Sequence, residues 1–341
     1  MTRTQQLKEI GERIDGLMAL DVAARGVSAG LYAAARKRSP EPLSLAAARA
    51  LRNRVGRGRH VLIATGWHDR PDVNSQIAET DGPLGAAVLA RALHDVCGAI
   101  PLVLTEERLV GPLQHILRAA GLSALLPEEA EAAAQVSAAL HAASVLGFPK
   151  NIEEARAHSE HLLAAFKPKA VLAVEVGGMN ANGQIFTFRG DDATQHTPKF
   201  DLLFQEAQRR RVVTIGVGDG GNEIGFGSMR KAAARRIPST RQPAQALVPT
   251  TEVDYLVPAA VSNWGAYAIA ASLCLLADRP DCLHTPAAEE RLLIAASGAG
   301  LIDGITGYVE PAVDGMTREV HMGLVALMQA TVESGCAALR R

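Results

Sequence analysis

Residues 212–227 read VVTIGVGDGGNEIGFG, in which a short apolar run passes directly into a loop of acidic and glycine residues. An apolar run of this length without polar alternation is typical of a strand buried on both faces. We therefore predict a strand over residues 212–217. Four similar runs predict further buried strands over residues 60–65, 100–105, 170–176 and 253–258.

Helical patterns separate these apolar runs. They cover residues 83–98, 109–120, 127–144, 152–166, 199–210 and 264–277, with a last pair over 286–297 and 317–335. Strands that alternate with helices pair in parallel through crossover connections. The pattern predicts an α/β fold with a mostly parallel sheet that helices cover on both faces. Residues 1–55 have helical spacing, so we expect an N-terminal helical extension packed on an α/β domain of residues 56–341.

The charge of the chain is almost balanced, with 35 lysine and arginine residues against 36 aspartate and glutamate residues. A net charge of −1 provides no bulk field that would hold nucleic acid or an anionic membrane. The longest apolar run, Gly265–Ala277, is too short to span a bilayer and is typical of a buried helix. We therefore expect neither a nucleic-acid partner nor a membrane partner.

The four cysteines lie far apart in the sequence and form no C-x-x-C pair. This spacing argues against a zinc ribbon, a redox motif and a secreted disulfide framework. The amino-terminal stretch MTRTQQLKEIGERIDGLMAL is polar with helical spacing and lacks the basic and apolar regions of a secretory signal. A reducing, cytoplasmic location is therefore expected.

Acidic residues follow several of the predicted strands. Asp81 lies in the loop after the first strand, and Glu175 lies at the tip of the third. Asp219 and Glu223 lie in the loop after the fourth strand, and Asp303 lies in a turn near the carboxyl terminus. Ligands bind beyond the carboxyl ends of parallel strands, so we expect these carboxylates on one rim. The structural alternatives are a helix cap for Asp81, a salt bridge for Glu175 and turn formation for Asp303.

A cluster of carboxylates on one rim requires a cation. Two bare carboxylates about 4 Å apart repel by roughly 4 kcal/mol at an effective dielectric constant of about 20. Oxygen ligands alone favour Mg²⁺ or Mn²⁺ over zinc. We therefore predict a divalent cation site whose ligands are Asp81, Glu175, Asp219 and Asp303.

The glycine-rich loop also matches G-x-G-x-x-G through Gly216, Gly218 and Gly221. A dinucleotide site requires an acidic residue about twenty positions further on, at a strand end, and none is well placed here. Asp219 would moreover face the phosphates, so no nucleotide cofactor is expected. The chain also lacks the H-E-x-x-H, G-x-S-x-G and G-x-x-x-x-G-K-[ST] patterns, which sets aside zincin, serine-hydrolase and P-loop functions.

Several uncommon motifs occur together in this chain: T-D-G-P-x-G-A at Thr80–Ala86, the strand glutamate Glu175, Arg189-Gly190, G-D-G-G-N-E-x-G at Gly218–Gly225, and V-S-N-W-G at Val261–Gly265. In these motifs the chain resembles the D-glutamate cyclase family over roughly residues 60–335. The resemblance implies a Rossmann-like core, akin to that of the metal-dependent DHH phosphoesterases, in a stand-alone cyclase domain. It also implies a hydro-lyase that converts D-glutamate to 5-oxo-D-proline with loss of water.

In this reaction the amine of the substrate attacks its own γ-carboxylate, so orientation in the pocket takes the place of an enzyme nucleophile. A general base must deprotonate the amine, and a general acid must assist the loss of water. We assign Asp219, Glu223 and Asn222 to catalysis. The residues expected to bind the substrate offer guanidinium, amide or backbone N–H groups; they are Arg70, Arg189, Gly220, Gly221 and Asn263. Asn263 has the alternative of capping the helix that follows it.

Two other functions fit the same residues. An acidic rim that holds two divalent ions is the usual arrangement of a phosphoesterase or pyrophosphatase. A non-enzymatic domain could use the same glycine loops to bind a small acidic metabolite tightly, without turnover. The alanine-rich helices could also form flat contacts with a second copy, so a homo-oligomer is a further expectation.

Overall fold

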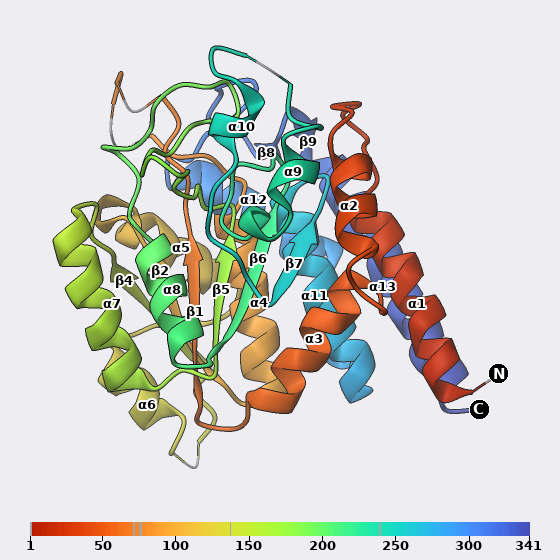
Figure 1. Cartoon of the computed structure of the whole chain (residues 1–341). Coiled ribbons are helices and arrows are strands. Elements are labelled where there is room, and N and C mark those ends of the chain that lie inside the picture. The colour runs from red at the N-terminus through yellow and green to blue at the C-terminus, as the bar shows by residue number, and fades with distance from the viewer. Residues whose placement is uncertain (1, 71, 75–76, 137, 239) are drawn as a thin grey trace.

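The computed structural model describes residues 2–70, 72–74, 77–136, 138–238 and 240–341. Within these residues, seven parallel strands form one sheet in the order β3-β4-β2-β1-β5-β6-β7 (Figure 1). The strands are β1 (His60–Thr65), β2 (Ile100–Thr105), β3 (Ser123–Ala124), β4 (Ala142–Gly147), β5 (Ala170–Val174), β6 (Val213–Gly218) and β7 (Tyr255–Pro258). A small antiparallel pair consists of β8 (Ala312–Val313) and β9 (Met316–Thr317). The predicted α/β fold with a mostly parallel sheet is confirmed.

The chain leaves the centre of the sheet in two directions. β1 pairs with β2 on one side, where His60 lies opposite Ile100, and with β5 on the other, where Val61 lies opposite Ala170. One half of the sheet therefore continues through β2, β4 and β3, and the other continues through β6 and β7. The loops after β1 and β5 diverge at this switch point. The crevice between such loops is where open α/β sheets bind their ligands.

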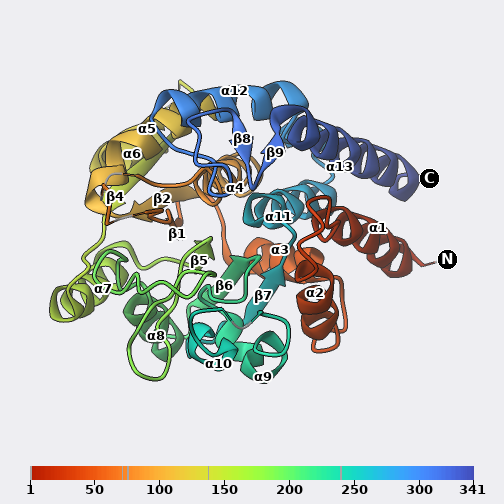
Figure 2. The same cartoon turned by 90° about the horizontal axis from the view of Figure 1, so that it is seen from above.

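Helices cover both faces of the sheet (Figure 2). Successive side chains of a strand point to opposite faces, so β1 contributes Val61 and Ile63 to one core and Leu62 and Ala64 to the other. The larger core includes α1 (Arg3–Met18), α2 (Ser28–Arg36), α3 (Leu43–Arg54), α4 (Pro83–Cys97), α5 (Val110–Ala119), α11 (Ser262–Ala277), α12 (Pro286–Gly298) and α13 (Arg318–Leu339). The smaller core includes α6 (Pro127–Ala133), α7 (Ile152–Phe166) and α8 (Asp201–Arg209), and the short helices α9 (Arg230–Ala233) and α10 (Ala244–Leu247) follow β6.

α11 is the central helix of the larger core. Every residue from Ser262 to Leu276 is buried, and the helix packs against α1, α3, α4 and α13. Its closest neighbour is α4, where a Cβ atom on Gly85 would lie 2.9 Å from the Cβ of Ala266. A helix that is apolar on all sides is expected to be enclosed by other elements, so the predicted buried helix at this position is confirmed.

The amino-terminal segment forms α1, α2 and α3, which pack against α11, α13 and β7. The buried carboxylate of Asp15 in α1 joins the three helices, because it accepts hydrogen bonds from the Tyr32 hydroxyl and from the backbone N–H groups of Leu43 and Ser44. Burial raises the pKa of Asp15. The turn between α1 and α2 reaches the carboxyl edge of the sheet, where Arg25 contacts Asp219. The helical extension is therefore part of the wall of the site described below.

One helix prediction is wrong at its end, and four strands of the described residues, β3, β4, β8 and β9, were not predicted. The helix predicted over residues 127–144 stops at Ala133, and residues 142–147 form β4 between β2 and β3. The alanines of this stretch favour a helix by intrinsic propensity. Pairing with β2 and burial within the sheet override that propensity. The third predicted strand is also shorter, because β5 ends at Val174 and Glu175 follows it.

α13 has the length and composition of a membrane-spanning helix, with a mean hydropathy of 1.3 over its most apolar window. Core helices of soluble proteins meet the same criterion. Here α13 packs against α1, α11 and α12. The side chains that it buries against them include Leu324, Val325, Met328 and Val332, so this face of the helix belongs to the protein core.

Candidate active site

A cavity of about 330 Å³ lies at the carboxyl end of the sheet, beside the switch point between β1 and β5. Its walls come from the loops after β1, β5 and β6, from the turn before α2 and from the segment that precedes β9. Its ionisable lining residues are Arg25, Asp69, Arg70, Asp72, Glu79, Asp81, Glu175, Arg189, Asp191, Asp219, Glu223 and Asp314. Nine of these are acidic and three are arginines, so the lining has a formal excess of six negative charges.

The amino terminus of α11 holds the carboxylate of Asp81. The backbone N–H groups of Ser262 and Asn263 donate to its two oxygens at 3.0 and 2.8 Å, and the N–H of Gly82 donates at 3.1 Å. Unpaired N–H groups and the positive end of the helix dipole both favour an anion at this position. Burial nevertheless raises the pKa of Asp81 to about 7, with a further contribution from the charge of Asp219. Asp81 is therefore fixed in place but carries its charge at a cost.

Glu175 follows β5 with a φ of 51°, in the left-handed region that residues with a side chain seldom adopt. Its carboxylate accepts a hydrogen bond from the Ser262 hydroxyl. The pKa of Glu175 is raised well above its usual range. Burial is the largest cause, and the negative charges of Asp219 and Glu223 add to it. Asp314 also lines the cavity, and its φ of 54° is likewise positive. Backbone strain of this kind concentrates at functional sites.

Glu223 organises the loop after β6. Its carboxylate accepts hydrogen bonds from the backbone N–H groups of Asp219, Gly220 and Gly221 at 3.1, 2.7 and 2.7 Å. The pKa of Glu223 is raised to about 7, chiefly by burial and secondly by the negative charge of Asp219. Asn222 lines the same cavity, and its side-chain amide donates to the carbonyl oxygen of Phe186. The loop thus presents Asp219, Asn222 and Glu223 to the cavity on a hydrogen-bonded frame.

Arg25 provides the innermost fixed positive charge. Its guanidinium lies 2.7 Å from Asp219 Oδ2 and 2.8 Å from Asp314 Oδ2, and it stacks 5.8 Å from the centre of the Phe188 ring. The charge of Asp219 raises the pKa of Arg25, although burial acts in the opposite direction. One guanidinium between two carboxylates offsets only part of the negative charge of the cavity.

Two groups of buried carboxylates could each hold a cation. One consists of Asp81, Asp219 and Asp314, and the other consists of Glu175, Asp219 and Glu223. Within each group, one oxygen from each residue lies within 4.8 Å of the others. Carboxylate oxygens suit Mg²⁺ and Mn²⁺. Asp219 is common to both groups, so it is the central residue of the site.

The structure brings most of the predicted residues to this cavity. The lining residues among them are Arg70, Asp81, Glu175, Arg189, Asp219, Asn222 and Glu223. Arg189 is exposed at the cavity and Arg70 is half-buried, where it contacts Asp69. Arg25 and Asp314 are among the lining residues that were not predicted as site residues from the sequence. Asp314 could have been suspected from the pair Asp314-Gly315, but no local pattern marks Arg25.

Asp303 does not join the carboxylate cluster. One of its oxygens accepts hydrogen bonds from the N–H groups of Ile305 and Thr306, and the other accepts one from Gly315. Asp303 therefore has the turn-forming role that was its structural alternative. Its hydrogen bonds hold the segment that leads to Asp314. Asp314 is the carboxylate from this segment that reaches the cavity.

Asn263, Gly220 and Gly221 also have structural partners. The side-chain oxygen of Asn263 accepts from the N–H groups of Gly82 and Gly85 at 2.9 and 2.7 Å, and its amide donates to the carbonyl oxygen of Thr80. It makes no side-chain cap on α11. The N–H groups of Gly220 and Gly221 donate to Glu223. These three residues build the loops of the site: the backbone N–H groups of both glycines and one of the two side-chain N–H groups of Asn263 donate to other loop residues.

The raised pKa of Glu223 predicts an unusual pH dependence of stability. A glutamate with a pKa near 4.3 when unfolded and about 7 when folded keeps its proton longer in the folded state. Its contribution to stability is therefore lost as pH rises from about 4 to about 7. In chelator, the free energy of unfolding of the wild type should fall relative to that of Glu223→Gln across this range, by about 1 kcal/mol per pH unit. Urea unfolding at several pH values measures the difference; parallel curves would contradict it.

The doubly wound sheet and the carboxylate-lined cavity at its switch point define an α/β protein with an acidic cavity at the edge where such sheets bind their ligands. A sequence model of the family described as "D-glutamate cyclase-like, C-terminal" matches residues 14–329, and the chain belongs to this family. The matched region begins within α1. It therefore includes Arg25, and it extends the resemblance seen in the motifs towards the amino terminus.

A curated relative with detectable similarity is human "D-glutamate cyclase, mitochondrial". The two sequences are 27% identical over 287 residues, which cover 82% of this chain and 42% of the relative. The chain thus spans less than half the length of that protein.

Proposed function

We propose that this chain is a hydro-lyase that closes D-glutamate to 5-oxo-D-proline with loss of water, assisted by a divalent cation. The observation that carries the proposal is the convergence of Asp81, Glu175, Asp219, Glu223 and Asp314 on one cavity at the switch point of a D-glutamate cyclase-like fold. The family supports the reaction class. The excess of carboxylates supports the requirement for a cation.

The charges around the cavity suit an amino acid with two carboxylates. Arg70 and Arg189 stand at its more exposed side, and Arg25 stands among the carboxylates. A guanidinium group binds a carboxylate through paired N–H donors. We assign the α-carboxylate of the substrate to Arg189 or Arg70, which leaves the substrate amine near the acidic loop after β6.

Ring closure forms one N–C bond and breaks one C–O bond within the substrate, and the departing oxygen leaves as water. Holding the amine against the γ-carboxyl group can supply much of the rate acceleration. A divalent cation held by Asp81, Asp219 and Asp314 would supply Lewis-acid polarisation of the γ-carboxyl group. Glu223, with a pKa of about 7, titrates where proton transfer at neutral pH is most effective. We assign Glu223 and Asp219 to removal and return of the proton.

The direct test is turnover by the purified chain, stripped with chelator and then resupplied with Mn²⁺ or Mg²⁺. D-glutamate and L-glutamate are incubated separately, and 5-oxoproline is followed by chiral chromatography. We expect metal-dependent product from the D isomer alone. Product without metal would retain the cyclase and overturn the role of the cation. Absence of product from either isomer would overturn the proposed reaction.

A second candidate is a metal-dependent phosphoesterase or pyrophosphatase. It is favoured by the two carboxylate groups that share Asp219, because two adjacent divalent ions are the usual arrangement for phosphoryl hydrolysis. Release of phosphate from pyrophosphate or p-nitrophenyl phosphate in Mn²⁺ would support it. The cyclase ranks first because the family match covers most of the chain.

A further inference from the structure

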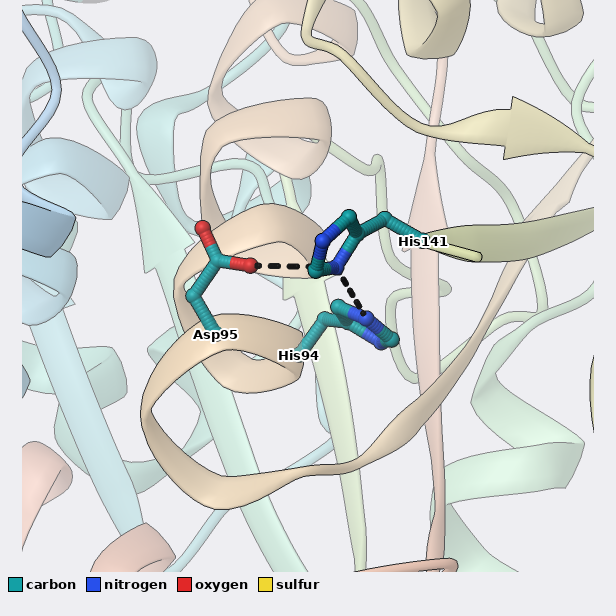
Figure 3. Close-up of side chains that lie close together, drawn as sticks. All are labelled: His94, Asp95 and His141. Atoms are coloured by element: carbon teal, nitrogen blue, oxygen red, sulfur yellow. Dashed lines mark hydrogen bonds and ion pairs between the residues drawn. The ribbon is translucent and has the colours of Figure 1, made fainter. Parts of the chain in front are cut away.

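A second cluster of potential metal ligands lies far from the cavity. His94 and Asp95 stand in the last turn of α4, and His141 immediately precedes β4 (Figure 3). α4 starts beside Asp81 at the carboxyl edge of the sheet and has 15 residues. His94 lies 11 residues after the first residue of α4, so at about 1.5 Å per residue the cluster is roughly 17 Å from the cavity along the helix. It therefore has no part in the chemistry proposed above.

The three side chains converge on one point. His94 Nε2 lies 3.0 Å from His141 Nδ1, and His141 Nδ1 lies 3.9 Å from Asp95 Oδ1. All three atoms lie within 4.8 Å of one another. The two imidazole rings meet edge to face, with an interplanar angle of 84°. The 3.0 Å contact nevertheless joins one nitrogen atom of each ring.

The surroundings leave these atoms free to coordinate. His94 Nδ1 lies 3.0 Å from the carbonyl oxygen of Ala99, and a carbonyl can only accept, so Nδ1 carries the proton. His94 Nε2 then offers its lone pair. A second ring nitrogen bound to a carbonyl is the arrangement that orients histidine ligands of metals. Asp95 contacts Arg91 through Oδ2 only, which leaves Oδ1 toward His141.

We propose that His94, Asp95 and His141 form a surface site for one divalent transition-metal ion. Two imidazole nitrogens and one carboxylate oxygen suit Zn²⁺, Ni²⁺, Co²⁺ or Cu²⁺ rather than Mg²⁺. The side chain of His141 is 59% exposed, so the remaining coordination positions are open to water. A bound ion would join the end of α4 to the start of β4, two segments that are 47 positions apart in the sequence.

The test uses the full chain and two histidine variants. Ni²⁺ is titrated calorimetrically in excess Mg²⁺, which competes for the oxygen ligands of the cavity. The wild type should show a binding event that His141→Ala weakens by at least about tenfold. The matched control is His115→Ala, because His115 is also exposed but lies outside the cluster, in α5. His115→Ala should bind Ni²⁺ as the wild type does.

Thermal unfolding gives an independent readout. An ion that binds only the folded state raises the unfolding temperature, so Ni²⁺ should stabilise the wild type and His115→Ala but not His141→Ala. Because His141 is exposed, the unfolding temperatures without metal should agree. Identical isotherms for the wild type and His141→Ala would overturn the site. So would Ni²⁺ binding that is lost in Asp219→Asn alone, because that result places the ion in the cavity.

Discussion

Asp219→Asn is expected to lower kcat/KM for 5-oxoproline formation by about 10²- to 10⁴-fold, the range lost with a general acid–base group. Asp219 belongs to both carboxylate groups and forms an ion pair with Arg25. Asparagine keeps the shape of the side chain but removes the charge. The substitution therefore weakens cation binding, proton transfer and the placement of Arg25 at the same time. Chiral chromatography of the product at saturating Mn²⁺ measures the loss.

The same substitution should not destabilise the fold. The charge of Asp219 raises the pKa values of Asp81, Glu175, Glu223 and Asp314, so its removal relieves repulsion in the cavity. The thermal unfolding temperature of Asp219→Asn in chelator should equal or exceed that of the wild type. Unfolding would then not explain the lost activity.

A matched control for this experiment is Asp281→Asn. Asp281 is exposed and pairs only with its neighbour Arg279 among the ion pairs of the described residues. An exposed pair contributes little to stability, and this one lies in the short turn after α11. Asp281→Asn should keep full activity. If Asp219→Asn also keeps full activity, both the acid–base assignment and the cation site centred on Asp219 are wrong.

The strands of the sheet centre were predictable because they are continuous apolar runs. β1 and β2 have the predicted bounds of 60–65 and 100–105. β4 was missed because its first residues continue an alanine-rich stretch, and helical propensity is a weak guide where burial decides. β3 has only two residues, Ser123 and Ala124, and no periodic pattern can mark so short a strand.

The carboxylates after β1, β5 and β6 were predictable from topology alone, because parallel strands place their carboxyl ends on one edge. Arg25 and Asp314 were not, because their segments reach the cavity only through the packing of α1, α2 and the turn before β9. The sequence also could not separate residues that bind a ligand from those that hold a loop. A polar side chain near a site, such as Asn263, can satisfy backbone groups instead.

Asn263→Ala is expected to produce the largest loss of stability, about 3–5 kcal/mol. The substitution removes three buried hydrogen bonds and leaves the N–H groups of Gly82 and Gly85 and the carbonyl of Thr80 without their side-chain partner. Each unsatisfied buried group costs about 1–3 kcal/mol. Gly82 has a φ of 96°, so the loop that it shapes depends on these bonds to keep Asp81 in place. Urea unfolding measures the change.

Asn151→Ala provides the comparison, because the same substitution there also removes two hydrogen bonds from backbone N–H groups. Asn151 caps α7 by accepting from Glu153 and Glu154, but it is exposed. Water can replace its bonds, so the expected loss is only about 1 kcal/mol. The difference between the two variants isolates burial as the cause. If Asn263→Ala unfolds like the wild type and instead raises KM for D-glutamate, Asn263 binds the substrate and the structural role assigned to it is wrong.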